Sequence, residues 1–86
     1  MDGTFNDSEN SIIIQVRSMW DGNIDIFKLS KKHPLRKTME SYSERIGVDF
    51  PFLRFFFKGR PIAAENTPEY LNIEHSDIIN CYQFRY

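Results

Sequence analysis

The sequence has few of the residues on which small proteins build disulfides, metal sites and phosphate loops. Its 86 residues include one cysteine, which excludes an internal disulfide and a zinc site made of several cysteines. The two histidines, His33 and His75, are far apart and have no third ligand nearby in the sequence. The four glycines are too widely separated to form a phosphate-binding loop. We therefore expect no metal, no cofactor and no enzymatic activity.

Long apolar stretches are also missing. No segment approaches the roughly 18–20 apolar residues that a membrane span requires, and residues 1–10 (MDGTFNDSEN) lack the features of a signal peptide. The sequence thus predicts no membrane contact. A single cysteine suits a reducing compartment, so we expect a nuclear or cytoplasmic location. Because residues 1–10 are acidic and almost free of large apolar groups, we predict a disordered tail there, followed by one domain over residues 11–86.

Aromatic side chains and an uneven charge distribution are what the sequence does provide. Aromatics make up 15% of the residues, and eight of them are phenylalanine, which supplies the large apolar area that a small core needs. Residues 28–60 carry nine basic and three acidic residues, a net charge of +6. The rest of the chain carries two basic and nine acidic residues, a net charge of −7. This polarity predicts that the middle of the chain attracts acidic partners.

Residues 34–46 (PLRKTMESYSERI) have the pattern of an amphipathic helix. Apolar residues recur there at spacings of four, three and four, which form one stripe of a helix. The residues of this stripe are Leu35, Met39, Tyr42 and Ile46. Pro34 suits the first helical position, and Gly47 suits the left-handed residue that ends a helix. A single helix of this kind needs a sheet to cover.

The segments on either side of the helix have strand patterns. We predict strands at residues 12–18, 24–30, 53–57 and 77–84, with a short edge strand around residues 60–62. The first two strands should form an antiparallel hairpin. In the second strand, apolar residues fall on both faces, so either a bulge changes the register or an apolar side chain lies on the outer face. Thr67 and Pro68 predict a helical turn that ends near Leu71.

Three aromatic or thiol features lie outside this pattern. Phe50, Pro51 and Phe52 predict a loop whose aromatic rings cover one end of the core. Trp20, in the turn of the hairpin, either covers the edge of the core or anchors a partner. Cys81 lies in the middle of the last strand on its inward face, so we expect an inert buried thiol rather than a nucleophile.

Residues 35–83 closely resemble the small ubiquitin-like modifier SUMO. The residues that carry the resemblance are Glu40-Ser41-Tyr42 with Arg45, Gly47 and Val48, the run LRFFFKGRPI, Asn66-Thr67-Pro68, and Asp77-Ile78-Ile79 with Tyr82-Gln83. The resemblance implies an α+β fold of the ubiquitin-like β-grasp type. In this fold a mixed sheet of four to five strands packs on one α-helix, and a short helical turn is added.

One feature departs from the family pattern. Conjugated members end in a slim Gly-Gly tail, whereas here no glycine follows Gly59 and the sequence ends with Phe84, Arg85 and Tyr86. We therefore expect a monomeric, non-covalent SUMO-like interaction module or adaptor of the SUMO pathway. The resemblance implies the SUMO-conjugating enzyme and SUMO-interacting peptides as its partners. Two alternatives stay open: a divergent conjugatable modifier whose diglycine tail is missing from this sequence, and, less favoured, a nucleic-acid-binding module.

The resemblance implies a peptide groove between the strand at 24–30 and the helix. An exposed strand edge there supplies backbone hydrogen bonds to a peptide, and basic residues attract acidic residues that flank it. The residues of this groove are Ile26, Phe27, Lys28, Leu29, Ser30, Lys37, Thr38, Ser41 and Arg45. Thr38 replaces the leucine usual in the family, and Ile26 replaces a polar residue. The alternative is that Phe27 and Leu29 are core residues and that the lysines only prevent unwanted strand pairing.

The resemblance also implies that the outer face of the sheet contacts the SUMO-conjugating enzyme. The residues of this face are Arg54, Phe56, Lys58, Gly59, Asp77, Ile78, Asn80 and Tyr82. Phe56, Ile78 and Tyr82 should point away from the helix, and clustered exposed apolar groups mark interfaces. Asp77 matches an acidic residue used at this face. Lys58 replaces a glutamate, and such a reversed charge at a rim changes association rate and partner choice.

Overall fold

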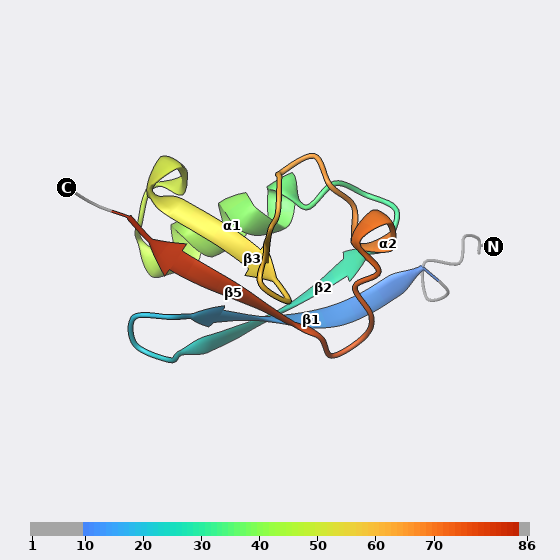
Figure 1. The fold of residues 1–86 in the computed structure, drawn as a ribbon, viewed down its shortest axis with the longest axis horizontal. Coiled ribbons are helices and arrows are strands. Elements are labelled where there is room, and N and C mark those ends of the chain that lie inside the picture. The colour runs from blue at the N-terminus through green and yellow to red at the C-terminus, as the bar shows by residue number, and fades with distance from the viewer. Residues whose placement is uncertain (1–9, 85–86) are drawn as a thin grey trace.

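The computed structural model describes residues 10–84, so nearly all of the predicted tail at residues 1–10 lies outside the described residues. One helix packs across a five-stranded sheet (Figure 1). No helix in this part of the chain is long and apolar enough to cross a membrane. The elements are, in order, β1 Ser11–Ser18, β2 Ile24–Ser30, α1 Arg36–Ile46, the 3-10 turn η2 Phe50–Phe52, β3 Leu53–Phe57, β4 Arg60–Pro61, α2 Pro68–Leu71 and β5 Ile78–Gln83.

The strands lie side by side in the order β2-β1-β5-β3-β4. β1 pairs antiparallel with β2 and parallel with β5, while β3 pairs antiparallel with both β5 and β4. The sheet is therefore mixed, with β2 and β4 at its two edges. The five strands, the single long helix and the short turn α2 confirm the predicted β-grasp architecture, and the predicted strands all form with small shifts at their ends.

The core lies between the sheet and α1. Leu35, Met39 and Tyr42 are buried and Ile46 is partly buried, which confirms the predicted apolar stripe of the helix. The rest of the core consists of Ile73, in the loop before β5, and of the inward residues of the strands, which are Ile12, Ile14, Val16, Leu53, Phe55, Phe57, Ile79 and Cys81. The buried position of Cys81 confirms the prediction of a core thiol.

The helix ends as the sequence indicates but begins two residues later than predicted. Gly47 takes a left-handed conformation with φ of 74°, and its N–H donates to the carbonyl of Ser43. At the other end, Leu35 is the N-cap residue and Pro34 lies before it, and the Leu35 N–H donates to the carbonyl of Asn66. The residue before the first turn of α1 is thus held by a contact with a distant loop, which no local pattern encodes.

The two faces of β2 are settled by its pairing with β1. Seven consecutive residue pairs join the strands in a regular register, so no bulge occurs. Phe27 and Leu29 therefore face the helix, and Ile24 and Ile26 face outward. The side chain of Ile26 is 61% exposed. Of the two alternatives, the one with apolar side chains on the outer face is confirmed.

The segment 50–52 forms a 3-10 turn rather than a plain loop, and only part of its aromatic surface covers the core. Phe50 packs against the core, 6.5 Å from Phe55 between ring centroids. Phe52 is 39% exposed and is not among the residues packed against the core, while its carbonyl accepts the N–H of Phe84. The prediction that both rings cover the core was therefore wrong for Phe52.

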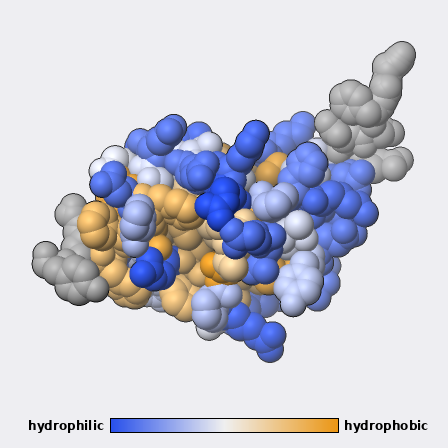
Figure 2. Space-filling view, turned by 90° about the horizontal axis from the view of Figure 1, so that it is seen from above, coloured by the Kyte–Doolittle hydropathy of each residue, from blue (hydrophilic) through white to orange (hydrophobic). Residues whose placement is uncertain are grey.

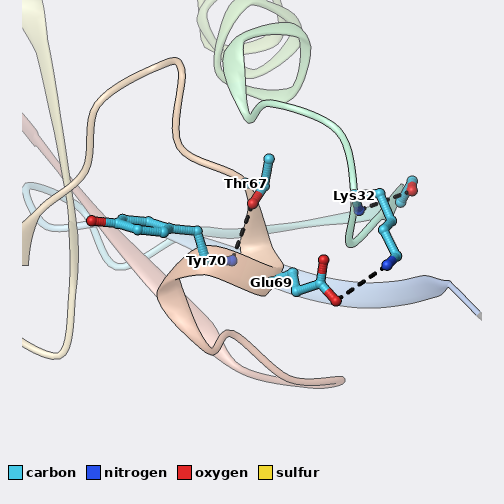
Figure 3. Close-up of polar contacts among 5 residues, drawn as sticks. Lys32, Thr67, Glu69 and Tyr70 are labelled. Carbon is cyan, nitrogen blue, oxygen red and sulfur yellow. Dashed lines mark hydrogen bonds and ion pairs between the residues drawn. The ribbon is translucent and has the colours of Figure 1, made fainter.

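The short helix α2 holds the chain that leads into α1 (Figure 3). Thr67 caps α2 by accepting the N–H of Tyr70 at 3.1 Å, as predicted for Thr67-Pro68. Glu69 pairs with Lys32 at 3.3 Å, and its N–H donates to the carbonyl of Lys31. These contacts fix the segment that follows β2, so they also fix one end of the space between β2 and α1.

Candidate functional site: a strand-edge groove and an aromatic sheet face

β2 presents an open backbone edge next to α1. Two hydrogen bonds, from Ser18 N–H to Asn23 and from Lys31 N–H to Asn10, show that the odd-numbered residues of this strand point their backbone groups toward β1. The alternate residues point theirs the other way, and no strand within residues 10–84 lies on that side of β2. The backbone groups that face this open edge are those of Ile24, Ile26 and Lys28.

A hollow of about 290 Å³ lies between this edge and the first turns of α1. It is lined by Phe27, Lys28, Leu29, Ser30, His33, Pro34, Lys37, Thr38 and Ser41. Seven of the nine residues predicted for the groove are therefore brought together. His33 and Pro34 are the two that sequence reasoning missed, although their position between β2 and α1 already placed them at its end. We call this the basic hollow.

The floor of the basic hollow is apolar and its rim is positively charged. Phe27 and Leu29 are partly buried and pack against the core, so they serve the core and the groove together. Lys28 and Lys37 are exposed, and neither forms an ion pair within residues 10–84. Lys37 lies on the α1 side of the hollow, whereas Lys28 lies on the edge strand, where its side chain leaves the sheet on the outer face, like that of Ile26.

Arg45 and Ile26 take other places than predicted. The guanidinium carbon of Arg45 lies 4.5 Å from the centroid of the Phe27 ring, and its Nη1 lies 3.5 Å from Asp25 Oδ1. It thus stands at the far end of the basic hollow and is engaged within the chain. Ile26 offers the groove only its backbone, since its side chain lies on the outer face of the sheet.

Beyond Arg45 the groove continues into a second hollow of about 420 Å³, which the sequence did not indicate. We call it the acidic hollow. It is lined by Ser18, Trp20, Asp21, Asn23, Ile24, Asp25, Tyr42, Arg45, Ile46 and Val48. The only signal in the sequence was Asp25, a charged residue on the inward face of a strand.

Two polar groups of the acidic hollow have perturbed pKa values. The hydroxyl of Ser18 donates to the carboxylate of Asp21, and Asn23 donates to it as well, so the pKa of Asp21 is lowered. Burial raises the pKa of Tyr42 well above its ordinary value, and the charges of Asp25 and Asp21 act in the same direction. The Tyr42 phenol therefore stays protonated, and such a hydroxyl can both donate and accept a hydrogen bond.

The outer face of the sheet carries an aromatic cluster at the end of β5. Phe56 and Tyr82 make an edge-to-face contact with ring centroids 5.3 Å apart. Phe84, which is 49% exposed, lies beside Arg54, with the guanidinium carbon 5.7 Å from its ring centroid. A hollow of about 320 Å³ is lined by Phe56, Gly59, Asn80, Tyr82 and Phe84. Sequence reasoning missed Phe84 as a member of this face.

The residues predicted for the outer face divide into two groups. Phe56, Gly59, Asn80 and Tyr82 line the aromatic hollow, and Arg54 adjoins it. Asp77 and Ile78 lie at the start of β5, next to Gln15 of β1. Asp77 accepts the N–H of Glu74 at 2.8 Å, so its carboxylate shapes the loop before β5. Lys58 has a positive φ in the β3–β4 turn, with its ammonium 5.3 Å from the Phe57 ring centroid.

A further apolar surface lies on the side of the sheet that carries α1. Figure 2 shows a broad hydrophobic area there. A hollow of about 400 Å³ on this side is lined by Met39, Phe50, Pro51, Leu53, Arg54, Phe55, Phe56, Pro61, Ile62 and Ala64. Phe56 lines both this hollow and the aromatic one, so the two surfaces are continuous around β3.

No group of three or more metal-binding side chains is found within residues 10–84. His75 instead accepts the backbone N–H of Ile13 at 3.1 Å. The site therefore consists of surfaces: a strand edge with two hollows, and an aromatic sheet face.

Comparison with known proteins agrees with this geometry. The model of the Ubiquitin family matches residues 14–84. Small ubiquitin-related modifier 2 of Homo sapiens is 40% identical over 63 residues, which cover 73% of this chain and 66% of the relative. The same identity is found with small ubiquitin-related modifier 2-A of Xenopus laevis, of which 66% is covered, and with small ubiquitin-related modifier 3 of Gallus gallus, of which 67% is covered.

A solved structure supports the same fold. A designed protein based on ubiquitin superimposes with a TM-score of 0.76, over 86% of this chain and 89% of the design, at 23% identity. The fold and the strand-edge groove define a ubiquitin-like β-grasp domain. The chain belongs to the ubiquitin family and is a SUMO-like member of it. The matched region spans about two-thirds of the length of these relatives.

Proposed function

We propose that this chain is a non-covalent SUMO-like interaction module of the SUMO pathway, and that its β2–α1 groove binds an extended apolar peptide flanked by acidic residues. The observation that carries the proposal is the open edge of β2 beside an apolar floor with two lysines at its rim. The chain's 40% identity to the SUMO proteins supports a place in their pathway. Peptide docking of this kind requires no covalent attachment.

The physical basis is β-augmentation. The free backbone groups of Ile26 and Lys28 can pair with a peptide strand, and Phe27 and Leu29 lie where alternate peptide side chains would pack. Each methylene buried on this floor contributes about 0.8 kcal/mol. Lys28 and Lys37 then select acidic flanks, and because both are exposed, that part of the affinity falls as salt rises.

A direct binding assay tests the proposal. The probe is a synthetic peptide of four apolar residues with three aspartates at one end, titrated by calorimetry or fluorescence anisotropy. We expect saturable binding that weakens by roughly threefold to fivefold in Lys28→Gln and in Lys37→Gln, the range of an exposed ion pair. Lys58→Gln is the matched control, since Lys58 is an exposed lysine at the other edge of the sheet. The absence of saturable binding, or an equal loss in Lys58→Gln, would contradict the proposal.

We also propose that the aromatic sheet face docks the SUMO-conjugating enzyme. The observation in favour is the hollow framed by Phe56, Tyr82 and Phe84, because contiguous exposed aromatic groups are typical of interfaces. Replacing Phe84 by Ser should weaken binding to that enzyme about tenfold or more. Tyr70→Ser is the control, since Tyr70 is 75% exposed and lies on α2, outside this face. Equal binding by wild type and F84S would count against the enzyme contact.

A conjugated modifier would behave differently in cells. Expression of the complete reading frame with a tag, followed by lysis under denaturing conditions, would then yield isopeptide-linked adducts. We expect the tagged protein to be recovered in unmodified form only. Recovery of adducts joined through its own C-terminus would favour the modifier role over the adaptor role.

A further inference from the structure

The β2–α1 groove has opposite charges at its two ends. Near Ser30 its rim carries Lys28 and Lys37, and near Ile24 the acidic hollow carries Asp21 and Asp25. The Arg45 side chain, over Phe27 and next to Asp25, separates the two hollows. A peptide strand bound along the open edge of β2 would therefore lie next to positive side chains at the Ser30 end and next to negative side chains at the Ile24 end.

Asp25 is the group in the acidic hollow that can take a further cation. Its single ionic contact, to Arg45, is long at 3.5 Å and leaves its other oxygen without a cation among the described residues. Asp21 differs, because both of its oxygens already accept hydrogen bonds from Ser18 and Asn23. Asp21 thus adds negative potential, and Asp25 supplies the contact.

The hydroxyl of Tyr42 is a second, independent indication of a ligand. The residue is fully buried, it lines the acidic hollow, and its hydroxyl has no hydrogen-bond partner within residues 10–84. Ser18 lies beside it, but the Ser18 hydroxyl donates to Asp21. Buried polar groups are nearly always paired, so an unpaired one on a residue that lines a hollow marks a place for a polar group from outside. Trp20, 41% exposed, also lines this hollow, and an aromatic ring attracts a nearby cation.

We propose that the groove binds a strand of defined charge polarity, with acidic residues over the basic hollow and one lysine or arginine in the acidic hollow. The charged group of that lysine or arginine would pair with the Asp25 carboxylate and lie next to the Trp20 ring. One of its N–H groups would donate a hydrogen bond to the Tyr42 oxygen. This inference rests on the proposed function of the groove and names the class of peptide that it selects. Ile24 and Ser30 are six residues apart, or about 20 Å along a strand, so the basic residue lies four to six positions from the acidic ones.

The experiment uses the full chain and four synthetic peptides with the same apolar core. Two have three aspartates at the N-terminal end and either lysine or glutamine beyond the core, and two have the reverse order. In one of the two orders we expect the lysine peptide to bind about fivefold more tightly than its glutamine partner. The preferred order also reports whether the peptide runs parallel or antiparallel to β2.

Variants of the chain then assign the preference to the acidic hollow. Asp25→Asn should reduce the ratio of the two affinities to one or below, because it removes the anion and leaves Arg45 unpaired. Arg45→Gln should raise the ratio above the wild-type value, because it frees Asp25. Tyr42→Phe should lower the ratio while keeping the ring in the core. Glu40→Gln, the same change of charge at an exposed position of α1 outside both hollows, should leave it unchanged.

The outcomes separate this inference from the proposed function. If all four peptides bind, but the lysine and glutamine peptides bind equally in both orders, the inferred charge polarity is wrong. The proposed function of the groove as a peptide site would still hold. A preference for lysine that persists in Asp25→Asn would also overturn the inference. If no peptide binds at all, both the groove and its polarity are wrong.

Discussion

The guanidinium of Arg45 lies over the ring of Phe27, with its central carbon 4.5 Å from the ring centroid, and also reaches Asp25. One side chain of α1 thus contacts an aromatic and an acidic residue of β2. The contact joins the helix to the edge strand and divides the groove into its basic and acidic hollows. Its contribution to stability and its contribution to binding can be measured separately.

Replacing Arg45 with glutamine should lower the free energy of unfolding by about 0.5–1 kcal/mol, the sum expected of an exposed cation–π contact and a weak ion pair. Urea denaturation followed by circular dichroism measures this difference. Lys37→Gln is the control and should change stability by a few tenths of a kcal/mol at most, since Lys37 has no ion pair within residues 10–84. A loss above about 2 kcal/mol in R45Q would contradict this assignment, because it exceeds what a cation–π contact and a weak ion pair contribute.

The helix end at Gly47 gives a second prediction. Its φ is 74°, and a Cβ built there would meet no atom within 4 Å, so a side chain causes backbone strain but no clash. Gly47→Ala should therefore cost about 1 kcal/mol of stability, and Gly47→Asn clearly less, because asparagine tolerates the left-handed conformation. Both variants are compared by urea denaturation. Equal stability of the alanine variant and the wild type would argue against this conformation.

The cap of α2 gives a third prediction. Thr67 Oγ1 accepts the N–H of Tyr70, and removal of a capping oxygen costs about 1 kcal/mol. We expect that loss for Thr67→Ala and most of the stability to return in Thr67→Ser, which keeps the oxygen. Thermal unfolding of the two variants measures the difference. If serine were as destabilising as alanine, the methyl group rather than the cap would be responsible.

Cys81 gives a prediction for alkaline pH. Burial raises the pKa of its thiol from 9.0 to about 12 in the folded chain. Between these values the unfolded chain loses the proton while the folded chain keeps it, so stability should fall as pH rises above 9. Urea denaturation at pH 8, 9 and 10 should show a smaller decline in Cys81→Ala than in the wild type. Identical slopes would contradict a thiol that is buried and protonated.

The same burial predicts slow chemistry at Cys81. The side chain has no exposed surface, and only the thiolate is a good nucleophile. A thiol reagent at pH 8 should react with it at the rate of unfolding and quickly once urea is added. Rapid reaction of the native chain would place the thiol at the surface.

Much of the fold could be predicted from periodic patterns. The stripe of Leu35, Met39, Tyr42 and Ile46 predicted the buried face of α1, because a helix repeats every 3.6 residues. Gly47 and Thr67 predicted the ends of α1 and α2, since both positions have strong local conformational preferences. The first residue of α1 could not be predicted in this way, because it depends on the hydrogen bond between Leu35 and Asn66, 31 positions apart.

The candidate site was predicted less completely, for a similar reason. Seven groove residues were found because they are neighbours along β2 or along one face of α1. The acidic hollow was missed because it joins the hairpin turn at Asp21 to the end of α1 at Ile46, and only the packed fold brings them together. Phe84 was missed as a member of the aromatic sheet face because its position depends on the pairing of β5 with β3 and on the hydrogen bond from its N–H to the Phe52 carbonyl.

The most direct test of the central claim is amide hydrogen exchange of the chain, measured by NMR with and without the acid-flanked apolar peptide. The free amides of Ile24, Ile26 and Lys28 face the open edge of β2, whereas those of Asp25 and Phe27 face β1. We expect saturating peptide to slow exchange at Ile26 and Lys28 by tenfold or more and to change exchange at Asp25 and Phe27 little. Unchanged exchange along β2, with new protection confined to the aromatic sheet face, would contradict the account.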